Sequence, residues 1–468
     1  MEIPPKHRTA VGGTRFRRLA LGLALELCTP WLLAMAQVTI PPPDARSVTR
    51  LSDLYASMER GNPRISAAQQ LVRAARARVP GATRPPDPQL QLGFMNYTLP
   101  GLAPMATLGM TQLQLMQMLP LGGKLTLAGQ VAGAQAAATE ERAHEVVWEL
   151  RNQTAMAFYD LYATDQQLVV ARETLRLLKD IALTAESMYR VGQGRQADVL
   201  RAQVEMARMV EDTLRMRAMR ETMVARLNAL LNRDADRAVA TPALPGFPAE
   251  LPARAWLDSV AAGTRPMIRA GLEDVRAADA SATLARRAII PDLQVGVQYA
   301  QRGATMTSLD ASGAPMSART TERMGSLMLG VSIPIFARDR QFQMRTEATA
   351  MKAMADAEVA AMRAETRGKI GEAYAGLTRA RNLTQLYRTT VLPQAEATVA
   401  SAMAAYRSGS VDFMTLLDDR MTVNKYRQEV AALEADEGKA WAELEMLTGH
   451  ELIDASSVRV VAWNGGGR

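Results

Sequence analysis

The stretch MYRVGQGRQADVLRAQVE, residues 188–205, recurs in altered form as AYRSGSVDFMTLLDDRMT, residues 405–422. The two stretches lie 217 residues apart, and the same spacing pairs Leu227 with Leu444 near the ends of the helical patterns that follow. An internal repeat of this length indicates that the chain contains two copies of one structural unit.

The first copy spans residues 37–240 and is expected to hold two strands and a hairpin of long helices. We place its strands at about 89–97 and 108–119, and its helical hairpin at about 123–232. The linker at 241–252, TPALPGFPAELP, separates it from the second copy, because no helix or central strand accommodates so many prolines.

The second copy spans residues 253–449 and repeats this order, and a C-terminal tail follows at 450–468. Its predicted strands and helical hairpin lie at about 292–300, 326–335 and 338–448. Between the strands, QRGATMTSLDASGAPMSARTTERMGS is interpreted as a longer loop.

The helical pattern from about Gly123 to Tyr189 corresponds to roughly 100 Å of helix, far more than an ordinary globular helix. Apolar and small residues recur in it every seven positions, in two rows: Leu161, Leu168, Leu175, Ala182 and Tyr189, and Thr164, Ala171, Leu178 and Ala185. This register predicts a coiled-coil seam. In the second copy, Pro393 either bends the corresponding helix or marks a looser connection between two stacked helices.

The predicted strands alternate between an apolar face and an uncharged, mostly polar or small face. The apolar residues are Leu90, Leu92 and Phe94; Leu113 and Leu115; Leu293, Val295, Val297 and Tyr299; and Leu327, Leu329, Val331 and Ile333. A soluble hairpin pair packed on helices has the same alternation. Glutamine and glycine occupy the other face, where a solvated face usually carries lysine and glutamate, and this favours transmembrane barrel strands.

Four strands cannot close a barrel by themselves. In lipid, each open edge would leave unpaired N–H and C=O groups, and bacterial barrels begin at about eight strands. Insertion of these strands into a membrane therefore requires several copies of the chain.

Residues 1–36 have the features of a secretory signal peptide: a basic run, an apolar segment and a terminal AMA. A membrane anchor is the alternative, but a glutamate and a proline interrupt the apolar run. Cleavage after Ala36 would remove Cys28, the single cysteine, and the residues before Cys28 do not fit a lipidation site. The mature chain would then have no disulfide or thiolate chemistry.

The net charge is +7, and residues 1–36 contribute +3 of it. The remaining charges of both signs are interleaved, which argues against nucleic-acid binding. Beyond residue 36 no run of about 18 apolar residues occurs, so no transmembrane helix is expected.

Catalysis and cofactor binding are not expected. The two histidines of the mature chain, His144 and His450, lie far apart in sequence, and LGGKL at 121–125 lacks the earlier glycine and the following Ser/Thr of a phosphate-binding loop. Methionines crowd the first strand pair, and thioethers suit Cu(I), although methionine is more often an apolar filler. The candidate metal ligands are Met105, Met110, Met116 and Met118.

The chain resembles the TolC-type outer-membrane efflux channels over essentially its whole mature length. The resemblance rests on the doubled order of strands and helical hairpins, on PDPQL (86–90) with IPDLQ (290–294), and on QMLPLGGKL (117–125) with VSIPIFARDR (331–340). Its most specific part is VLPQAEATVASAMAAYRSGSVDFMTLLDDR, residues 391–420.

This resemblance implies a mainly α fold with a small membrane β part. Three protomers would each give four strands to a 12-stranded β-barrel, which continues into a long α-helical barrel of coiled-coil hairpins in the periplasm of a Gram-negative bacterium. It also implies outer-membrane lipid around the strands, a periplasmic adaptor of the membrane fusion protein type, and an inner-membrane pump, in our interpretation of the resistance-nodulation-division type. The channel itself would be a passive exit duct without a cofactor.

The turns Tyr189–Asp198 and Tyr406–Asp419 would lie at the periplasmic entrance, where the family docks its adaptor and closes its gate. The residues carried over to this gate and adaptor tip are Tyr189, Arg190, Gly192, Asp198, Tyr406, Arg407, Gly409, Asp412 and Asp418. Arg190 and Arg407 could pair with the acids. Val411 stands where the family's gate often has arginine. As an alternative to a gate, the charged residues at the two turns would only cap and solvate the helix ends.

The stretch MNYTLPGLAPMATLGMTQLQLMQMLPLGGKL, residues 95–125, is similar to the heavy-metal branch of the family, which exports copper, silver, or cobalt, zinc and cadmium. Heavy-metal cations are therefore the preferred substrates. Drugs or other small organic compounds are the alternative. A protein of another class, either a soluble periplasmic coiled-coil scaffold or a metal-binding protein, also fits the helical pattern.

Overall fold

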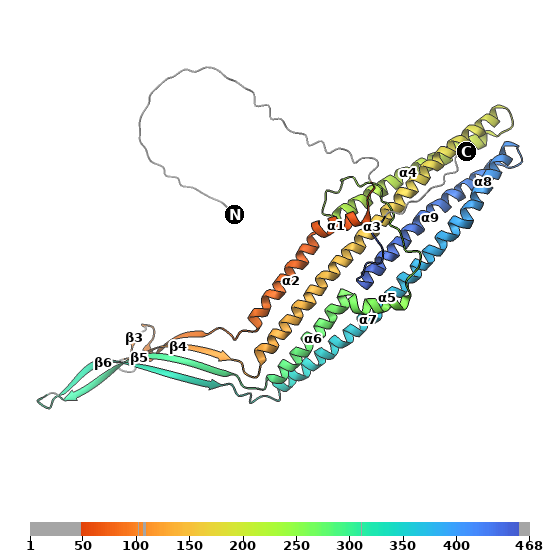
Figure 1. Cartoon of the computed structure of the whole chain (residues 1–468). Helices are drawn as coiled ribbons and strands as arrows, with labels where there is room; N and C mark the ends of the chain where they lie inside the picture. The colour runs from red at the N-terminus through yellow and green to blue at the C-terminus, as the bar shows by residue number, and fades with distance from the viewer. Residues whose placement is uncertain (1–47, 102, 106–108, 310, 458–468) are drawn as a thin grey trace, which may run out of the picture. The chain divides into compact units, whose positions relative to one another are not determined.

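A computed structural model describes residues 48–101, 103–105, 109–309 and 311–457 (Figure 1). All of them belong to one compact unit, Ala45–Arg468. The expected signal peptide at 1–36 and the end of the predicted tail lie outside the described residues.

The first copy begins with two helices, α1 (Leu51–Gly61) and α2 (Pro63–Ala82). Asn62 separates them, and its side-chain oxygen accepts the N–H of Arg64 at 2.9 Å, which caps α2. The remaining elements are β1 (Gln89–Met95), β2 (Tyr97–Thr98), β3 (Ala103–Pro104), β4 (Met110–Leu119), α3 (Lys124–Arg190) and α4 (Gln196–Leu230).

The second copy repeats this order without counterparts of the short strands β2 and β3. Pro266 opens α6 as Pro63 opens α2, because proline suits the first turn of a helix. The elements are α5 (Arg254–Thr264), α6 (Pro266–Arg287), β5 (Leu293–Leu309), β6 (Pro315–Val331), α7 (Gln341–Leu386), the π-helical turn η1 (Tyr387–Val391), α8 (Leu392–Arg407) and α9 (Phe413–Thr448).

The strands form one antiparallel sheet in the order β1-β4-β5-β6, and β2 pairs with β3 separately. The pairing of β4 with β5 joins the two copies. Within the described chain the helices pack on one another, and no helix covers either face of the four-stranded sheet (Figure 1).

The predicted loop at 301–326 is wrong. Most of it is strand, because β5 continues to Leu309 and β6 begins at Pro315. The pairing of β4 with β5 ends at Met110 opposite Arg302, so beyond this point β5 and β6 pair only with each other. The ribbon residues whose burial the structure describes are exposed or half-buried, and a ribbon of this kind carries no alternating pattern, which explains why the sequence did not indicate it. At its other end β6 stops at Val331, so Ile333 lies outside the strand.

The long helices bury the predicted seven-residue rows. Helix α3 packs against α2, α4, α6 and α9, and α7 packs against α6 and α9 (Figure 1). Both rows are buried or partly buried, with the exception of Tyr189, which is exposed at the end of α3, and most of their residues belong to or pack against two hydrophobic clusters. Large and small residues therefore alternate along a close helix contact, as in a coiled coil.

Pro393 lies just after the π-helical turn that joins α7 to α8. The N–H of Leu392 bonds to the carbonyl of Tyr387, a step of five residues, and Pro393 itself has no N–H to donate. The helix continues through the proline, so the alternative of two loosely connected helices is wrong. None of the described helices is long and apolar enough to cross a membrane.

Candidate functional site

The four-stranded sheet has two chemically different faces. Residues opposite one another on neighbouring strands share a face, and Leu92, Leu113 and Tyr299 form one row across three strands. Most of the large apolar side chains of this face are exposed, and Leu327 and Leu329 are each 70% exposed, whereas Leu293 and Val295 are half-buried. A continuous uncovered apolar surface of this kind requires an apolar medium or another chain.

The opposite face is uncharged over most of its length. Gln91, Gln114 and Gln298 form one of its rows. The first charged residues on this face are Arg302, which lies opposite Met110 at the start of β4, and Glu322. These two form an ion pair 2.8 Å apart. The candidate ligands Met110, Met116 and Met118 lie on this face, whereas Met105 follows β3 and is exposed outside the four-stranded sheet.

The two helical hairpins turn with the same backbone geometry. Gly192 and Gly409 both adopt a left-handed conformation with φ of 74°. In the first turn the N–H of Gln193 donates to the carbonyl of Met188 at 2.9 Å, and Gly192 donates to Tyr189 at 3.1 Å. The equivalent bonds in the second turn, Ser410 to Ala405 and Gly409 to Tyr406, are both 3.0 Å long. These paired bonds define a Schellman motif, in which glycine adopts positive φ at little cost.

The helices that follow the turns begin differently. The Asp412 side chain accepts the N–H of Thr415 and caps α9, whereas Arg195 at the equivalent position makes no side-chain cap for α4. Hydrogen bonds from Thr415 lower the pKa of Asp412, and the positive charge of Arg195 lowers it further. The two equivalent positions therefore carry opposite charges that attract across the two turns.

Asp198 and Tyr406 are brought close together from different hairpins. Burial raises the pKa of the Tyr406 hydroxyl, and the nearby charge of Asp198 raises it further. The hydroxyl oxygen is buried and has no hydrogen-bond partner among the described residues. The Tyr406 ring packs edge-on against Phe413, with ring centroids 5.8 Å apart.

The predicted arginine pairs are not formed within one chain. Arg190 lies 3.8 Å from Glu186, four residues earlier on α3. No ion pair in the described part of the chain joins Arg190 or Arg407 to Asp198, Asp412 or Asp418.

An ion pair that no sequence pattern predicted lies at the junction of strands and helices. Lys124, the first residue of α3, lies 2.8 Å from Asp292, just before β5, and also donates to the carbonyl of Ile290 at 2.6 Å. Both side chains are largely buried. The pair connects the two copies where the sheet meets the helices, and no spacing in the sequence relates its members.

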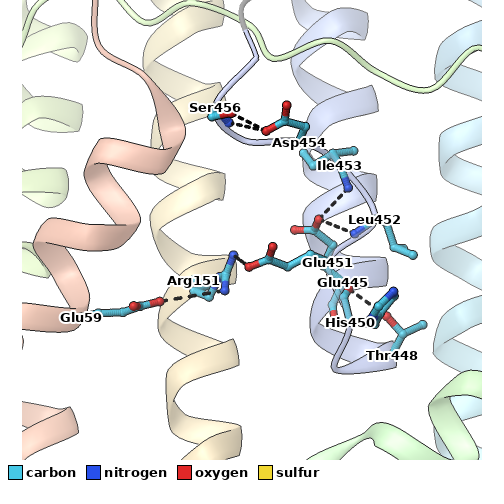
Figure 2. Close-up of polar contacts among 10 residues, drawn as sticks. All are labelled: Glu59, Arg151, Glu445, Thr448, His450, Glu451, Leu452, Ile453, Asp454 and Ser456. Carbon is cyan, nitrogen blue, oxygen red and sulfur yellow. Dashed lines mark hydrogen bonds and ion pairs between the residues drawn. The ribbon is translucent and has the colours of Figure 1, made fainter.

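A second missed cluster holds the segment that follows α9. Figure 2 shows Glu445, which is 3% exposed and accepts the N–H groups of Leu452 at 2.8 Å and Ile453 at 3.0 Å. Burial raises the pKa of Glu445 to about 7. Nearby, Arg151 of α3 donates to Glu451 at 2.6 Å and lies over the ring of Tyr55, 4.5 Å from its centroid. The cluster ties the end of the second copy to the first.

A profile of the outer membrane efflux protein family matches residues 54–233 and 257–450, one segment in each copy. The chain belongs to the outer membrane efflux protein family. The prediction of an outer-membrane location is thereby confirmed. Among curated proteins, none was significantly similar to this chain.

Solved structures of outer-membrane efflux proteins have the same fold. CusC is 19% identical, with a TM-score of 0.72, and the match covers 86% of this chain and 92% of that chain. VceC of Vibrio cholerae is 16% identical, with a TM-score of 0.70 over 86% of this chain and 96% of its own. MtrE of Neisseria gonorrhoeae is 17% identical, with a TM-score of 0.69 over 86% and 90%. The predicted mainly helical fold with a small sheet is confirmed.

Proposed function

We propose that three copies of this chain form the outer-membrane exit duct of a tripartite efflux system. The observation that carries the proposal is the uncovered four-stranded sheet, whose apolar face is exposed and whose outer strands β1 and β6 each pair on one side only. Joining β1 of one protomer to β6 of the next closes a 12-stranded barrel and satisfies both edges. The apolar face then lies in lipid and the glutamine-rich face lines the pore.

The long helices would continue the barrel as a duct through the periplasm. In each copy the helical turn lies at the end of the long helix opposite to the strands, so both turns would reach the periplasmic entrance. We place the adaptor at the turns of Gly192 and Gly409, and an inner-membrane pump of the resistance-nodulation-division type beyond it. MtrE is described as an outer-membrane channel in an open state, which supports a duct with a gate.

The proposed gate comprises the charged residues around the two turns. Asp198 and Tyr406 come from the two hairpins of one protomer, and the charge of Asp198 acts on the Tyr406 hydroxyl. Arg190, Arg407 and Asp418 would make contacts between protomers. The duct would carry its substrates passively, without chemistry of its own. The preferred substrates are heavy-metal cations, and the methionines of the pore-facing sheet support this choice.

Planar lipid bilayers test the proposal. The purified protein is expected to insert and give discrete conductance steps. Gln298→Lys places a positive charge on the pore-facing side and is expected to shift the reversal potential toward anions. If the purified protein shows no conductance steps, or if Gln298→Lys leaves the ion selectivity unchanged, the proposed pore is wrong.

A further inference from the structure

In the part of the sheet where all four strands lie side by side, up to Arg302 on β5, all methionines lie on one face. The register places these side chains with the glutamines on the proposed pore side: Met95, Met110, Met116, Met118, Met324 and Met328. Every leucine, valine, phenylalanine and tyrosine of the same paired segments lies on the opposite face. Methionine chosen only for its apolar character would be found on both faces, or with the leucines.

Two of these methionines face each other across a glycine. Gly296 on β5 stands opposite Met116 on β4 and Met328 on β6. A Cβ atom placed on Gly296 would lie 3.3 Å from the Cγ of Met116 and 3.6 Å from the Cβ of Met328. The two side chains therefore flank a notch that exists because residue 296 has no side chain.

The chemistry of this face favours soft cations. A thioether sulfur is a neutral, polarisable ligand that suits Cu(I) and disfavours hard cations. On this face of the sheet, the described residues from the row of Gln89 and Met116 up to the row before Arg302 are uncharged. No carboxylate is therefore offered there to Mg²⁺, Ca²⁺ or Zn²⁺. Weak neutral ligands also suit a pathway, because an ion that is held too tightly does not leave.

We propose that Met116 and Met328, on either side of Gly296, form a binding site for monovalent soft cations, Cu⁺ or Ag⁺, on the pore wall. The inference rests on the proposed function, because it takes this face as the lining of the duct. It narrows the substrate class from heavy metals in general to ions that bind thioethers.

Silver titration of the detergent-purified protein labelled with ¹³C-methyl methionine tests the site. The Met116 and Met328 signals are assigned with Met116→Leu and Met328→Leu. We expect these two signals to shift at lower Ag⁺ concentrations than the signal of Met351, which is exposed on α7. The double variant should bind Ag⁺ about tenfold more weakly, whereas Met344→Leu with Met351→Leu should not change the affinity. Signals that shift together with Met351 would overturn the site.

A second variant tests the notch itself. Gly296→Val fills the space between the two methionines while both thioethers remain in the chain, and it should also weaken Ag⁺ binding by about tenfold. Undiminished binding would overturn the proposed geometry. Conductance in potassium chloride separates this inference from the proposed function. A conducting protein without preferential Ag⁺ binding refutes only the cation site, whereas a protein that does not conduct refutes the duct.

Discussion

Gly192 and Gly409 lie 217 residues apart and have the same backbone conformation, with φ of 74° in each. Replacement of either glycine by alanine would force a Cβ atom into the left-handed region, at a cost of about 1 kcal/mol. We expect Gly192→Ala and Gly409→Ala each to lower the melting temperature of the assembly and to weaken adaptor binding. Gly368→Ala is the control, because Gly368 lies inside helix α7, where alanine is favoured. An equal loss in all three variants would contradict a specific role of the turns.

Neighbouring residues on β5 test which face of the sheet meets lipid. Val297 lies on the apolar face and Gln298 on the glutamine-rich face. A lysine in the lipid-facing position costs about 2–4 kcal/mol near the bilayer midplane. Val297→Lys should therefore sharply reduce the protein in the outer-membrane fraction, while Gln298→Lys should insert normally. Normal insertion of Val297→Lys would contradict the assigned faces.

The carboxylates at the turns test the gate. If they take part in contacts that hold the duct closed, removing one should increase the open fraction by about tenfold, because a hydrogen bond to a charged group contributes about 1.5–3 kcal/mol. Asp198→Ala and Asp418→Ala should therefore raise single-channel conductance or open time. Asp180→Ala, an exposed site on α3, should not change them. Unchanged currents in the first two variants would remove these residues from the gate.

The buried carboxyl of Glu445 predicts a pH dependence of stability. Its pKa is raised from 4.5 to about 7, so the folded chain binds this proton more tightly than the unfolded chain. Its contribution is therefore largest below pH 4.5 and is lost as the pH rises through 7, by roughly 3 kcal/mol.

We expect the melting temperature of Glu445→Gln to depend less on pH between 5 and 8 than that of the original protein, in thermal melts of the detergent-solubilised assembly. Glu451→Gln, an exposed neighbour on the same segment, should keep the original dependence. Identical pH profiles for Glu445→Gln and the unmodified chain would exclude Glu445 as the titrating group.

The structural features that were predicted correctly are those whose sequence pattern repeats. The spacing of 217 residues located two turns with matching hydrogen bonds, and the seven-residue rows of α3 are buried or partly buried except at Tyr189. The apolar alternation located the strands wherever one face differs from the other. It did not reveal the extension of β5 and β6 beyond Arg302. There the two strands pair only with each other, and they have no distinct apolar face.

Contacts between distant single residues could not be predicted. Lys124 and Asp292 meet because β4 pairs with β5, and neither residue belongs to a periodic pattern. Likewise, Glu445 accepts two backbone N–H groups only because the chain turns back toward it after α9. Such contacts become visible only when the register of the sheet and the packing of the helices are known.

The mass of the protein extracted from membranes shows directly whether three chains assemble in the outer membrane. Cells that produce the full chain are fractionated, the outer membrane is dissolved in mild detergent, and the mass of the protein component is measured by light scattering. We expect three chains per particle, obtained only with detergent. A single chain released into the aqueous fraction by salt alone would contradict the trimeric membrane duct.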